Sequence, residues 1–472
     1  MRTIRAGSGA SLVCLLTVML LMVAPASAEA ARQLKTGLSL GGSMSDWGFD
    51  HAASAHARVL RDTVSWRTTA PSRPSHPRDP ADPGYRWSAT DEFVKTAANR
   101  GFKVLLTVSS TPTWAEGPGK KHARHEGTWK PDAGALGDFA HALARRYSGS
   151  FRPAGAGVLP RVRYFEAWTE ANLSQLLEPQ WENGKPASPG IYRGLANAVS
   201  AGVKSVHSSN RVMGPGLAPY GDSRKTPATA GPRMRPVFFL RQLLCLKDRK
   251  KLKRKKHCGH PVKLDIVSHH PINSSGAPTR HAIHPDDASS ADLHRVMRVV
   301  RAAQRKGTIR PKHKHRKLWA TETWWESKPP SGRGVPPKKQ ARWLEKALYI
   351  FWRDGASTVI QQPLRDGTTP GSGYGGGLFF SNGKAKPAYR AFRFPFITNR
   401  QSRHKLTAWG KTPRGGKVKV QVMRGKHHHW RTRKRLSVHG NEVFKTSLRL
   451  RGKARLRAKI RAQKSLVWKQ KR

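Results

Sequence analysis

The sequence has few acidic residues and a large excess of basic ones. Its 472 residues include 28 Asp and Glu against 88 Lys and Arg, which gives a formal net charge of +60. Such an excess indicates attraction to polyanions, which include nucleic acids, acidic cell-envelope polymers and acidic glycans. No long collagen, coiled-coil or low-complexity repeat is present, and the 15 Trp and 15 Phe lie within apolar segments. A disordered basic chain is therefore excluded, because such chains have few aromatic residues.

Long hydrophobic runs are absent except near the N-terminus. The apolar run 11–23 follows Arg2 and Arg5 and precedes the small residues 26–28. This arrangement is typical of a secretory signal peptide over residues 1–28. A membrane anchor is the alternative, but the run is shorter than the roughly 20 residues that a spanning helix needs. We therefore expect a secreted, extracellular protein with no transmembrane segment in its mature chain.

Cysteine is also scarce. Cys14 lies inside the predicted signal peptide, so the mature chain keeps only Cys245 and Cys258. Two cysteines that close a short loop in an exported protein favour a disulfide bond. The alternative is a zinc site with His257 and His260, but the cysteines lack the paired spacing of a zinc ribbon or finger. We expect a Cys245–Cys258 disulfide, no metal site and no cofactor.

Between about residues 34 and 397, short apolar runs alternate with amphipathic stretches. Eight such alternations predict a parallel α/β fold, and a closed (β/α)8 TIM barrel fits that number best. A doubly wound open sheet is the alternative, but no G-x-G-x-x-G loop follows the first strand. The predicted strands are 34–40, 57–62, 103–108, 162–168, 212–215, 264–270, 317–321 and 358–362. The predicted helices are 91–100, 132–147, 191–206, 290–305 and 338–353.

The pattern changes in the last part of the chain. Period-two alternation appears at 417–422 and recurs around 430–438, 443–450 and 454–460, with glycine turns between. This predicts a basic antiparallel β-sandwich-like domain over 401–472, after a barrel domain over 29–400. The only acidic residue of this smaller domain is Glu442. Two further basic runs, 247–256 and 311–317, interrupt the barrel.

Two of the scarce acidic residues stand at the ends of the fourth and seventh predicted strands. These are Glu170 and Glu322. The carboxyl ends of barrel strands form the mouth of the active site, so we expect both side chains to face one pocket. Paired carboxylates there suit glycoside hydrolysis, in which one gives a proton to the leaving oxygen and the other attacks the anomeric carbon. Two ordinary surface glutamates are the alternative, and Glu166 is a reserve candidate.

These segments resemble the clan A glycoside hydrolases, which are retaining (β/α)8 enzymes with cellulase-like and xylosidase-like members. The segment 168–172, W-T-E-A-N, is similar to the W-N-E-P-N-like segment that closes strand four of that family. The segment 321–325, T-E-T-W-W, is similar to the family's T-E-x-x-W-like segment at strand seven. The resemblance spans roughly residues 34–397. It implies that Glu170 is the acid/base and Glu322 the nucleophile of a retaining mechanism.

Three other segments match the family in the same order along the chain. The segment 60–66 is similar to the strand-two segment whose arginine supports the nucleophile, and segments 107–115 and 267–271 resemble those of strands three and six. Tryptophans near strand or loop ends can stack on sugars, although such rings also serve as core or rim packing. The substrate-binding residues expected on these grounds are Arg61, Trp66, Trp114, Thr169, Asn172, His270 and Trp324.

The chain departs from the family at Thr169, where the family has an asparagine whose amide binds the sugar 2-hydroxyl. A threonine hydroxyl can still form a hydrogen bond, but its reach is shorter. Contacts to the 2-hydroxyl strengthen in the transition state, so this change bears directly on rate and substrate choice.

The sequence therefore predicts a secreted retaining glycoside hydrolase that cleaves O-glycosidic bonds of a polysaccharide or oligosaccharide. A non-catalytic glycan- or cell-envelope-binding protein on the same barrel is the alternative, favoured by Thr169 and the basic surface. A nucleic-acid binder would explain the charge but not the paired glutamates, and the basic runs lack interleaved aromatic residues. We expect a carbohydrate substrate, no specific nucleic acid, and an anionic cell-envelope polymer bound near the cell wall by the C-terminal domain.

Overall fold

The computed structural model describes residues 33–41, 44–222, 231–273, 276–312, 316–369, 374–425 and 429–471. The predicted signal peptide, residues 1–28, lies outside the described residues, as does the middle of the basic run 311–317. Among the helices that are described, none has the length and apolar character needed to cross a bilayer.

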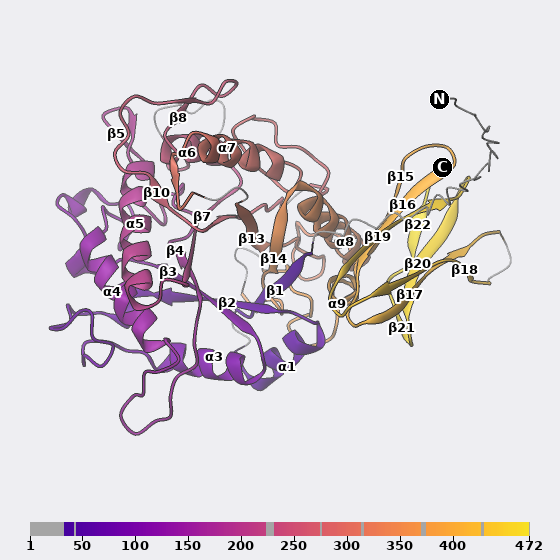
Figure 1. Ribbon diagram of the computed structural model, residues 1–472, viewed down its shortest axis with the longest axis horizontal. Coiled ribbons are helices and arrows are strands. Elements are labelled where there is room, and N and C mark those ends of the chain that lie inside the picture. Colours follow the sequence, from indigo (N-terminus) through magenta and orange to yellow (C-terminus); the bar gives the residue numbers. More distant parts are fainter. Residues whose placement is uncertain are drawn as a thin grey trace, which may run out of the picture. The chain divides into compact units, whose positions relative to one another are not determined.

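Eight parallel strands close into a barrel, which confirms the predicted (β/α)8 architecture (Figure 1). Each barrel strand pairs with the next one along the chain, and the last pairs with the first. All eight predicted strands are present, with ends that differ by a few residues. They are β1 (Lys35–Ser39), β2 (Val59–Ser65), β3 (Lys103–Ser109), β4 (Tyr164–Ala167), β7 (Arg211–Leu217), β11 (Ile266–His269), β13 (Lys317–Thr323) and β14 (Ala356–Gln361).

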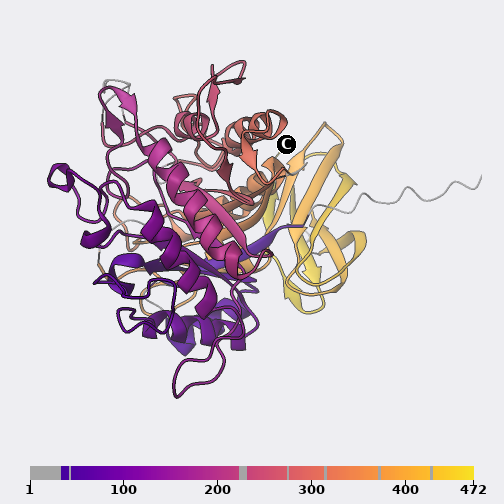
Figure 2. The same ribbon diagram turned by 60° about the vertical axis from the view of Figure 1, so that its left-hand side comes forward.

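Helices surround the barrel strands, as the two views of the chain show (Figures 1 and 2). The five predicted helices correspond to α3 (Ser88–Asn99), α4 (Ala133–Arg146), α5 (Ser188–Val206), α7 (Leu293–Arg305) and α8 (Pro337–Asp354). The sequence did not predict the shorter helices, which show too few turns for a clear apolar periodicity. These are α1 (Asp46–Ser54), α2 (Trp66–Thr69), α6 (Pro236–Leu243) and α9 (Pro387–Arg393), with 3₁₀ turns at Thr113–Ala115 and Lys120–His122.

Three short ladders lie in the connections between barrel elements. They are β5 (Trp181–Glu182) with β6 (Lys185–Pro186), β8 (Leu246–Lys247) with β9 (Lys253–Arg254), and β10 (Val262–Lys263) with β12 (Ile309–Arg310). The β8–β9 hairpin carries the basic run 247–256, and the predicted disulfide between Cys245 and Cys258 closes it. Both sulfurs belong to this bond, so the alternative of a zinc site at these cysteines is wrong.

Two antiparallel sheets follow the barrel, which confirms the predicted β domain. One sheet has the order β15 (Phe396–Arg400), β16 (Lys405–Lys411) and β19 (Val443–Arg449). The other has the order β18 (Arg431–Val438), β17 (Gly416–Met423), β20 (Ala454–Ile460) and β21 (Gln463–Lys464), with β22 (Trp468–Gln470) also paired to β20. The first strand, β15, begins before residue 401.

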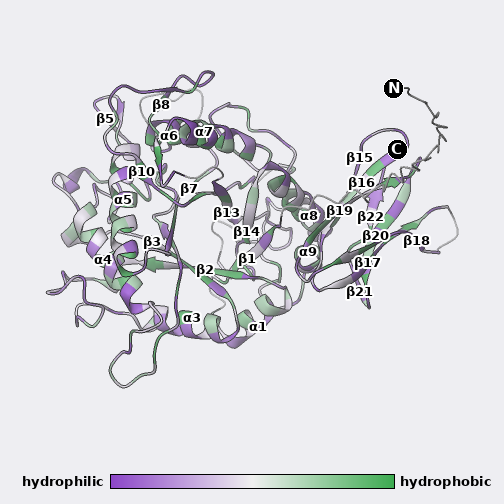
Figure 3. Cartoon of the chain, in the orientation of Figure 1, coloured by the Kyte–Doolittle hydropathy of each residue, from purple (hydrophilic) through white to green (hydrophobic). Residues whose placement is uncertain are grey.

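The two antiparallel sheets share one apolar core, which includes Phe396, Leu406, Val420 and Leu456. Hydrophobic and hydrophilic residues alternate along these strands, as the pattern of the sequence predicts (Figure 3). The β15 and β16 strands lie against helix α8 of the barrel. Lys346 on α8 donates to Asn399 Oδ1 at 2.6 Å, and the Trp409 ring packs on the ring of Tyr349 at 5.6 Å between centroids.

Candidate active site

The inside of the barrel is apolar at one level and polar at the next. Residues two positions apart on a strand point to the same face. The apolar level includes Val59, Leu105, Tyr164, Ile266 and Trp319 on five strands. Two positions later on the same strands stand the buried polar residues Arg61, Thr107, Glu166, Ser268 and Thr321. Strand alternation alone therefore places an arginine and a carboxylate inside the barrel, toward the carboxyl ends of its strands.

Glu166 on β4 is fully buried and surrounded by donors. Arg61 Nε lies 3.2 Å from Glu166 Oε2, and the hydroxyls of Thr107 and Thr321 donate to its two oxygens at 2.8 and 3.0 Å. Burial raises the pKa of Glu166, but the charges of Arg61 and His270 outweigh it, so that the pKa lies below its ordinary value. Glu166 is therefore an ionised partner that fixes the Arg61 guanidinium.

Arg61 on β2 connects this buried carboxylate with Glu322 and Thr169. Its NH1 lies 3.4 Å from Glu322 Oε2, and its NH2 donates to Thr169 Oγ1 at 3.4 Å. Burial lowers the pKa of Arg61, but the carboxylates of Glu166, Glu322 and Glu170 raise it above its ordinary value. The guanidinium is a permanent positive charge beside Glu322, and it also donates a hydrogen bond to the hydroxyl of Thr169.

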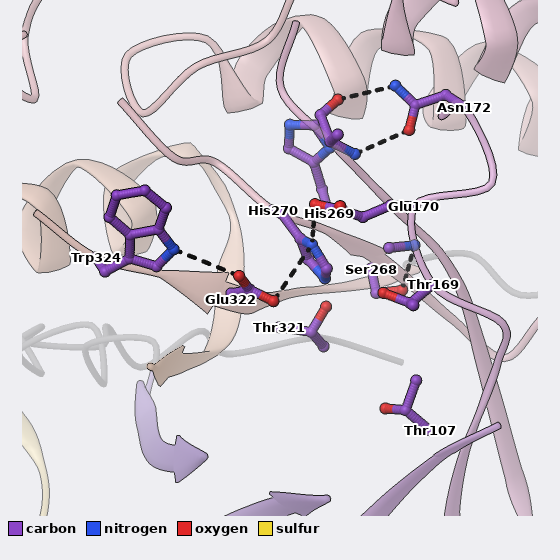
Figure 4. A network of polar contacts seen from close by, with 12 residues as sticks. Thr107, Thr169, Glu170, Asn172, Ser268, His269, His270, Thr321, Glu322 and Trp324 are labelled. Atoms are coloured by element: carbon purple, nitrogen blue, oxygen red, sulfur yellow. Dashed lines mark hydrogen bonds and ion pairs between the residues drawn. The ribbon is translucent and has the colours of Figure 1, made fainter. Parts of the chain in front are cut away.

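The two glutamates singled out by the sequence meet at one imidazole (Figure 4). His270 Nδ1 lies 2.8 Å from Glu170 Oε1 and 3.7 Å from Glu322 Oε2. His270 is fully buried, whereas the side chains of Glu170 and Glu322 are 21% and 13% exposed. Trp324 Nε1 donates to Glu322 Oε1 at 3.4 Å. The two carboxylates are therefore partly exposed to solvent, whereas Arg61 and His270, which contact them, are buried.

His270 is held in place by charge and by close packing. Burial lowers its pKa, but Glu322 and Glu170 outweigh that cost and raise the pKa above the ordinary value. Gly216 closes the other side of the ring, because a Cβ there would lie 3.3 Å from His270 Nε2 and 3.0 Å from Glu166 Oε1. Gly216 also has a φ of +55°, which favours glycine.

The backbone after β4 turns sharply to bring Glu170 to the mouth of the pocket. Trp168 and Glu170 have φ angles of 67° and 42°, in the left-handed region that non-glycine residues rarely adopt. The Glu170 N–H donates to the Gly216 carbonyl at 3.0 Å, and the Trp168 indole donates to the Leu176 carbonyl at 2.8 Å. Surrounding contacts thus hold a strained turn, as is common where a side chain must be aimed at a ligand.

The structure brings most of the predicted substrate-binding residues together around Glu170 and Glu322. Arg61, Thr169, His270 and Trp324 all contact a glutamate or each other within it. Trp114 follows β3 and is half-buried, and its indole donates to the Ala70 carbonyl at 2.9 Å. No polar contact of the Trp114 side chain with the glutamates occurs among the described residues. Its proposed place at the rim stays a prediction.

Two of the predicted substrate-binding residues lie elsewhere. Trp66 is the first residue of α2, has no exposed surface, and packs between the rings of Trp114 and Phe139. Asn172 is also fully buried: its Nδ2 donates to the carbonyls of Ala218 and Met234, and its Oδ1 accepts the Ala218 N–H. The prediction that these two residues bind substrate is therefore wrong. Trp66 is a core residue, and Asn172 joins two loops through its hydrogen bonds to Ala218 and Met234.

The spacing of the two carboxylates bears on the chemistry that they can perform. Both lie within reach of His270 Nδ1, so one oxygen of Glu170 and one of Glu322 are no farther apart than the two distances combined, about 6.5 Å. Retaining glycosidases keep their carboxyl groups about 5–5.5 Å apart, whereas inverting ones need about 6.5–9.5 Å to admit a water. The upper bound for these two oxygens equals the lower limit of the inverting range, and the retaining separation lies below it.

Several residues that support the two glutamates could not be singled out from the sequence. Thr107, Thr321 and Gly216 were not predicted as part of the site. The sequence does contain a pattern that could have found two of them, since Thr107 and Thr321 lie on predicted strands at positions whose side chains point inward with Arg61.

Within the described residues, no group of three or more His, Cys, Asp and Glu side chains could hold a metal ion.

Comparison with known proteins relates the chain to others through its fold. No protein-family model and no curated protein sequence matches it. Its structure is similar to a family 39 glycoside hydrolase from the gut symbiont Bacteroides cellulosilyticus WH2, with a TM-score of 0.52 and 16% identity over 89% of this chain and 81% of that chain. It is also similar to a glucosidase from Croceicoccus marinus, with a TM-score of 0.50 and 15% identity over 89% of this chain and 94% of that one. The chain therefore has the fold of these two enzymes.

Proposed function

We propose that this protein is a retaining glycoside hydrolase that cleaves O-glycosidic bonds of a polysaccharide or oligosaccharide. The observation that carries the proposal is the meeting of Glu170 and Glu322 at His270, at the carboxyl ends of β4 and β13. The similarity in fold to a family 39 glycoside hydrolase and a glucosidase supports it.

In the first step, Glu322 attacks the anomeric carbon while Glu170 gives its proton to the glycosidic oxygen. The carbon–oxygen bond breaks, the leaving sugar departs as an alcohol, and a glycosyl ester forms on Glu322. The Arg61 NH1 group, 3.4 Å from Glu322 Oε2, favours the ionised nucleophile. His270 Nδ1, 2.8 Å from Glu170 Oε1, can stabilise the carboxylate that appears on Glu170 as its proton leaves.

In the second step, the Glu170 carboxylate takes a proton from water as the water oxygen attacks the anomeric carbon. The ester bond to Glu322 breaks and its carboxylate is restored, so the product keeps the configuration of the substrate. The Trp324 indole lies beside Glu322 Oε1, and the Thr169 hydroxyl lies beside Arg61. We propose both as substrate contacts.

The proposal places the enzyme outside the cell. Residues 1–28 have the pattern of a signal peptide, and the disulfide Cys245–Cys258 suits an oxidising compartment. The basic C-terminal domain would keep the enzyme close to an anionic cell-envelope polymer. Protein recovered from the medium should begin at Glu29, and an intact N-terminus at Met1 would contradict export by cleavage.

A non-catalytic glycan-binding protein is the second candidate, and Thr169 favours it. The hydroxyl of Thr169 accepts a hydrogen bond from Arg61 NH2 at 3.4 Å, so it is shared between the guanidinium and any sugar. Weak contact with a sugar 2-hydroxyl would reduce transition-state stabilisation, while the pocket could still hold a glycan.

The test is hydrolysis by the purified mature chain on a panel of aryl glycosides and polysaccharides. Glu170→Ala and Glu322→Ala should each lower kcat/KM by about 10²–10⁴-fold or more, because each removes a group that acts in the transition state. Added azide should restore turnover to both variants, giving an inverted glycosyl azide with E322A and a retained one with E170A. The control is Glu92→Ala, which removes an exposed glutamate of α3. A wild-type protein that binds glycans but hydrolyses none of the panel would favour the second candidate.

A further inference from the structure

One face of the five-stranded antiparallel sheet carries a group of cations. Residues such as Val418, Val420, Leu456 and Ile460 point into the shared core. The residues between them point outward, and the strand register places basic side chains side by side there. We call this surface the cationic face, and it consists of Lys417, Lys419, Arg435, Arg455, Arg457, Lys459, Lys464 and Lys469.

Like charges stand directly opposite each other across the strands of this face. Lys419 on β17 pairs with Arg435 on β18 and with Lys459 on β20. Arg455 pairs with Lys469, and Lys459 also pairs with Lys464. Like charges at directly opposed positions destabilise a sheet. Such an arrangement lowers stability, and a bound polyanion would compensate for it.

The cationic face is open to solvent, and its members form no ion pair with an acidic residue that the structure describes. Lys417, Lys419, Arg435 and Arg455 are exposed. Of the ion pairs formed by the described residues, none involves a member of this face. Arg457 is held differently, because its Nε donates to Gln421 Oε1 at 2.9 Å and its guanidinium lies 4.0 Å from the centre of the Trp430 ring. The charges are thus free for a ligand from outside the chain.

We infer that the cationic face binds a linear acidic polysaccharide, with acid groups on successive sugars contacting cations on successive strands. Neighbouring strands lie about 4.8 Å apart, and residues i and i+2 on one strand lie about 6.6 Å apart, so the cations form a regular array. This inference rests on the association with an anionic polymer proposed above, but not on the proposed hydrolysis.

Nucleic acid fits this face less well. Proteins that hold single strands place several aromatic rings among their basic residues, so that successive bases can stack. Among the cation–ring contacts of the described residues, only that of Arg457 with the Trp430 ring involves a member of this face, and Arg457 covers one side of that ring. Carboxylate or sulfate groups on a sugar chain need cations but no stacking platform.

The test compares two double variants with the same change of net charge in the full mature chain. Lys419→Gln with Lys459→Gln removes two opposed cations of the face. Lys250→Gln with Lys251→Gln removes two exposed cations of the β8–β9 hairpin as a matched control. Calorimetry measures the Kd for polygalacturonate of defined length over a range of NaCl concentrations, with a neutral dextran as the uncharged reference.

We expect K419Q/K459Q to weaken polygalacturonate binding at least tenfold and to reduce the slope of log Kobs against log salt by about two. Its Tm should equal or exceed that of the wild type, which excludes unfolding as the cause. The control should bind as the wild type does. Equal losses in both variants, no loss in either, or tighter binding of oligodeoxythymidylate of equal charge would overturn the inference. If the wild type binds polygalacturonate, K419Q/K459Q loses this binding and the wild type hydrolyses no sugar, the inference stands and the proposed hydrolysis is contradicted.

Discussion

The barrel pocket around Glu170 and Glu322 and the cationic face of the C-terminal sheet differ in how their cations are paired and exposed. In the pocket, Arg61 and His270 are buried and each contacts carboxylates within 4 Å. On the cationic face, cations such as Lys419 and Arg435 oppose each other and face solvent. The net charge of +60 therefore does not indicate the chemistry of the site. The few acids define the pocket, and the many bases define a surface.

The two regions should respond in opposite directions when a cation is removed. Arg61→Met should lower the free energy of unfolding by about 3–5 kcal/mol, because it leaves Glu166 as an unpaired buried charge. Urea denaturation measures this. The control is Arg58→Met, an exposed cation just before β2, which should change stability by less than about 0.5 kcal/mol. An equal loss of unfolding free energy in the two variants would contradict the claim that the carboxylate partners of Arg61 make its removal costly.

Much of this contrast could be predicted from the sequence, because it follows from periodicity. The eight barrel strands followed from apolar runs, and the ends of two of them singled out Glu170 and Glu322. Arg61 followed from the resemblance of segment 60–66 to the strand-two segment of the clan A glycoside hydrolases. The same alternation in 417–422 and 454–460 separated core valines and leucines from outward cations. These features depend on local pattern, so a single sequence contains them.

The rest depends on packing, which no local pattern records. Trp66 follows a barrel strand as a rim residue would, but the start of α2 turns its ring against Trp114 and Phe139. Asn172 lies two residues after Glu170, yet the strained turn at Glu170 directs it toward the Ala218 and Met234 carbonyls. Whether a side chain enters a pocket or a core was decided by the backbone turn in both cases.

The pocket should also show a pH dependence of stability. The raised pKa of His270 comes from carboxylates that attract its charged form, so its contribution is fully present below the ordinary value of 6.5. It is lost as the pH rises through the higher pKa of the folded state. The free energy of unfolding of the wild type, minus that of His270→Gln, should therefore fall across this interval. Glu322→Gln should weaken the fall, and a difference that stays constant with pH would contradict the proposed charge coupling.

The smallest expected effect lies on the cationic face, and it has the opposite sign. A double-mutant cycle with Lys419→Gln and Arg435→Gln should give a repulsive coupling of about 0.2–1 kcal/mol in the free energy of unfolding. Either single variant should be as stable as the wild type or slightly more so. An attractive coupling would show that these cations are held by partners, and the comparison with the pocket would fail.

The central claim is that Glu322 and Glu170 act as nucleophile and acid/base in one pocket. Its most direct test is covalent trapping with a 2-deoxy-2-fluoro glycoside of a sugar that the wild type hydrolyses, followed by mass spectrometry of the peptides. The account predicts one glycosyl group on the peptide that contains Glu322, and increased accumulation of that species in Glu170→Ala. A label on Glu170 or Glu166, or steady hydrolysis without any covalent species, would contradict it.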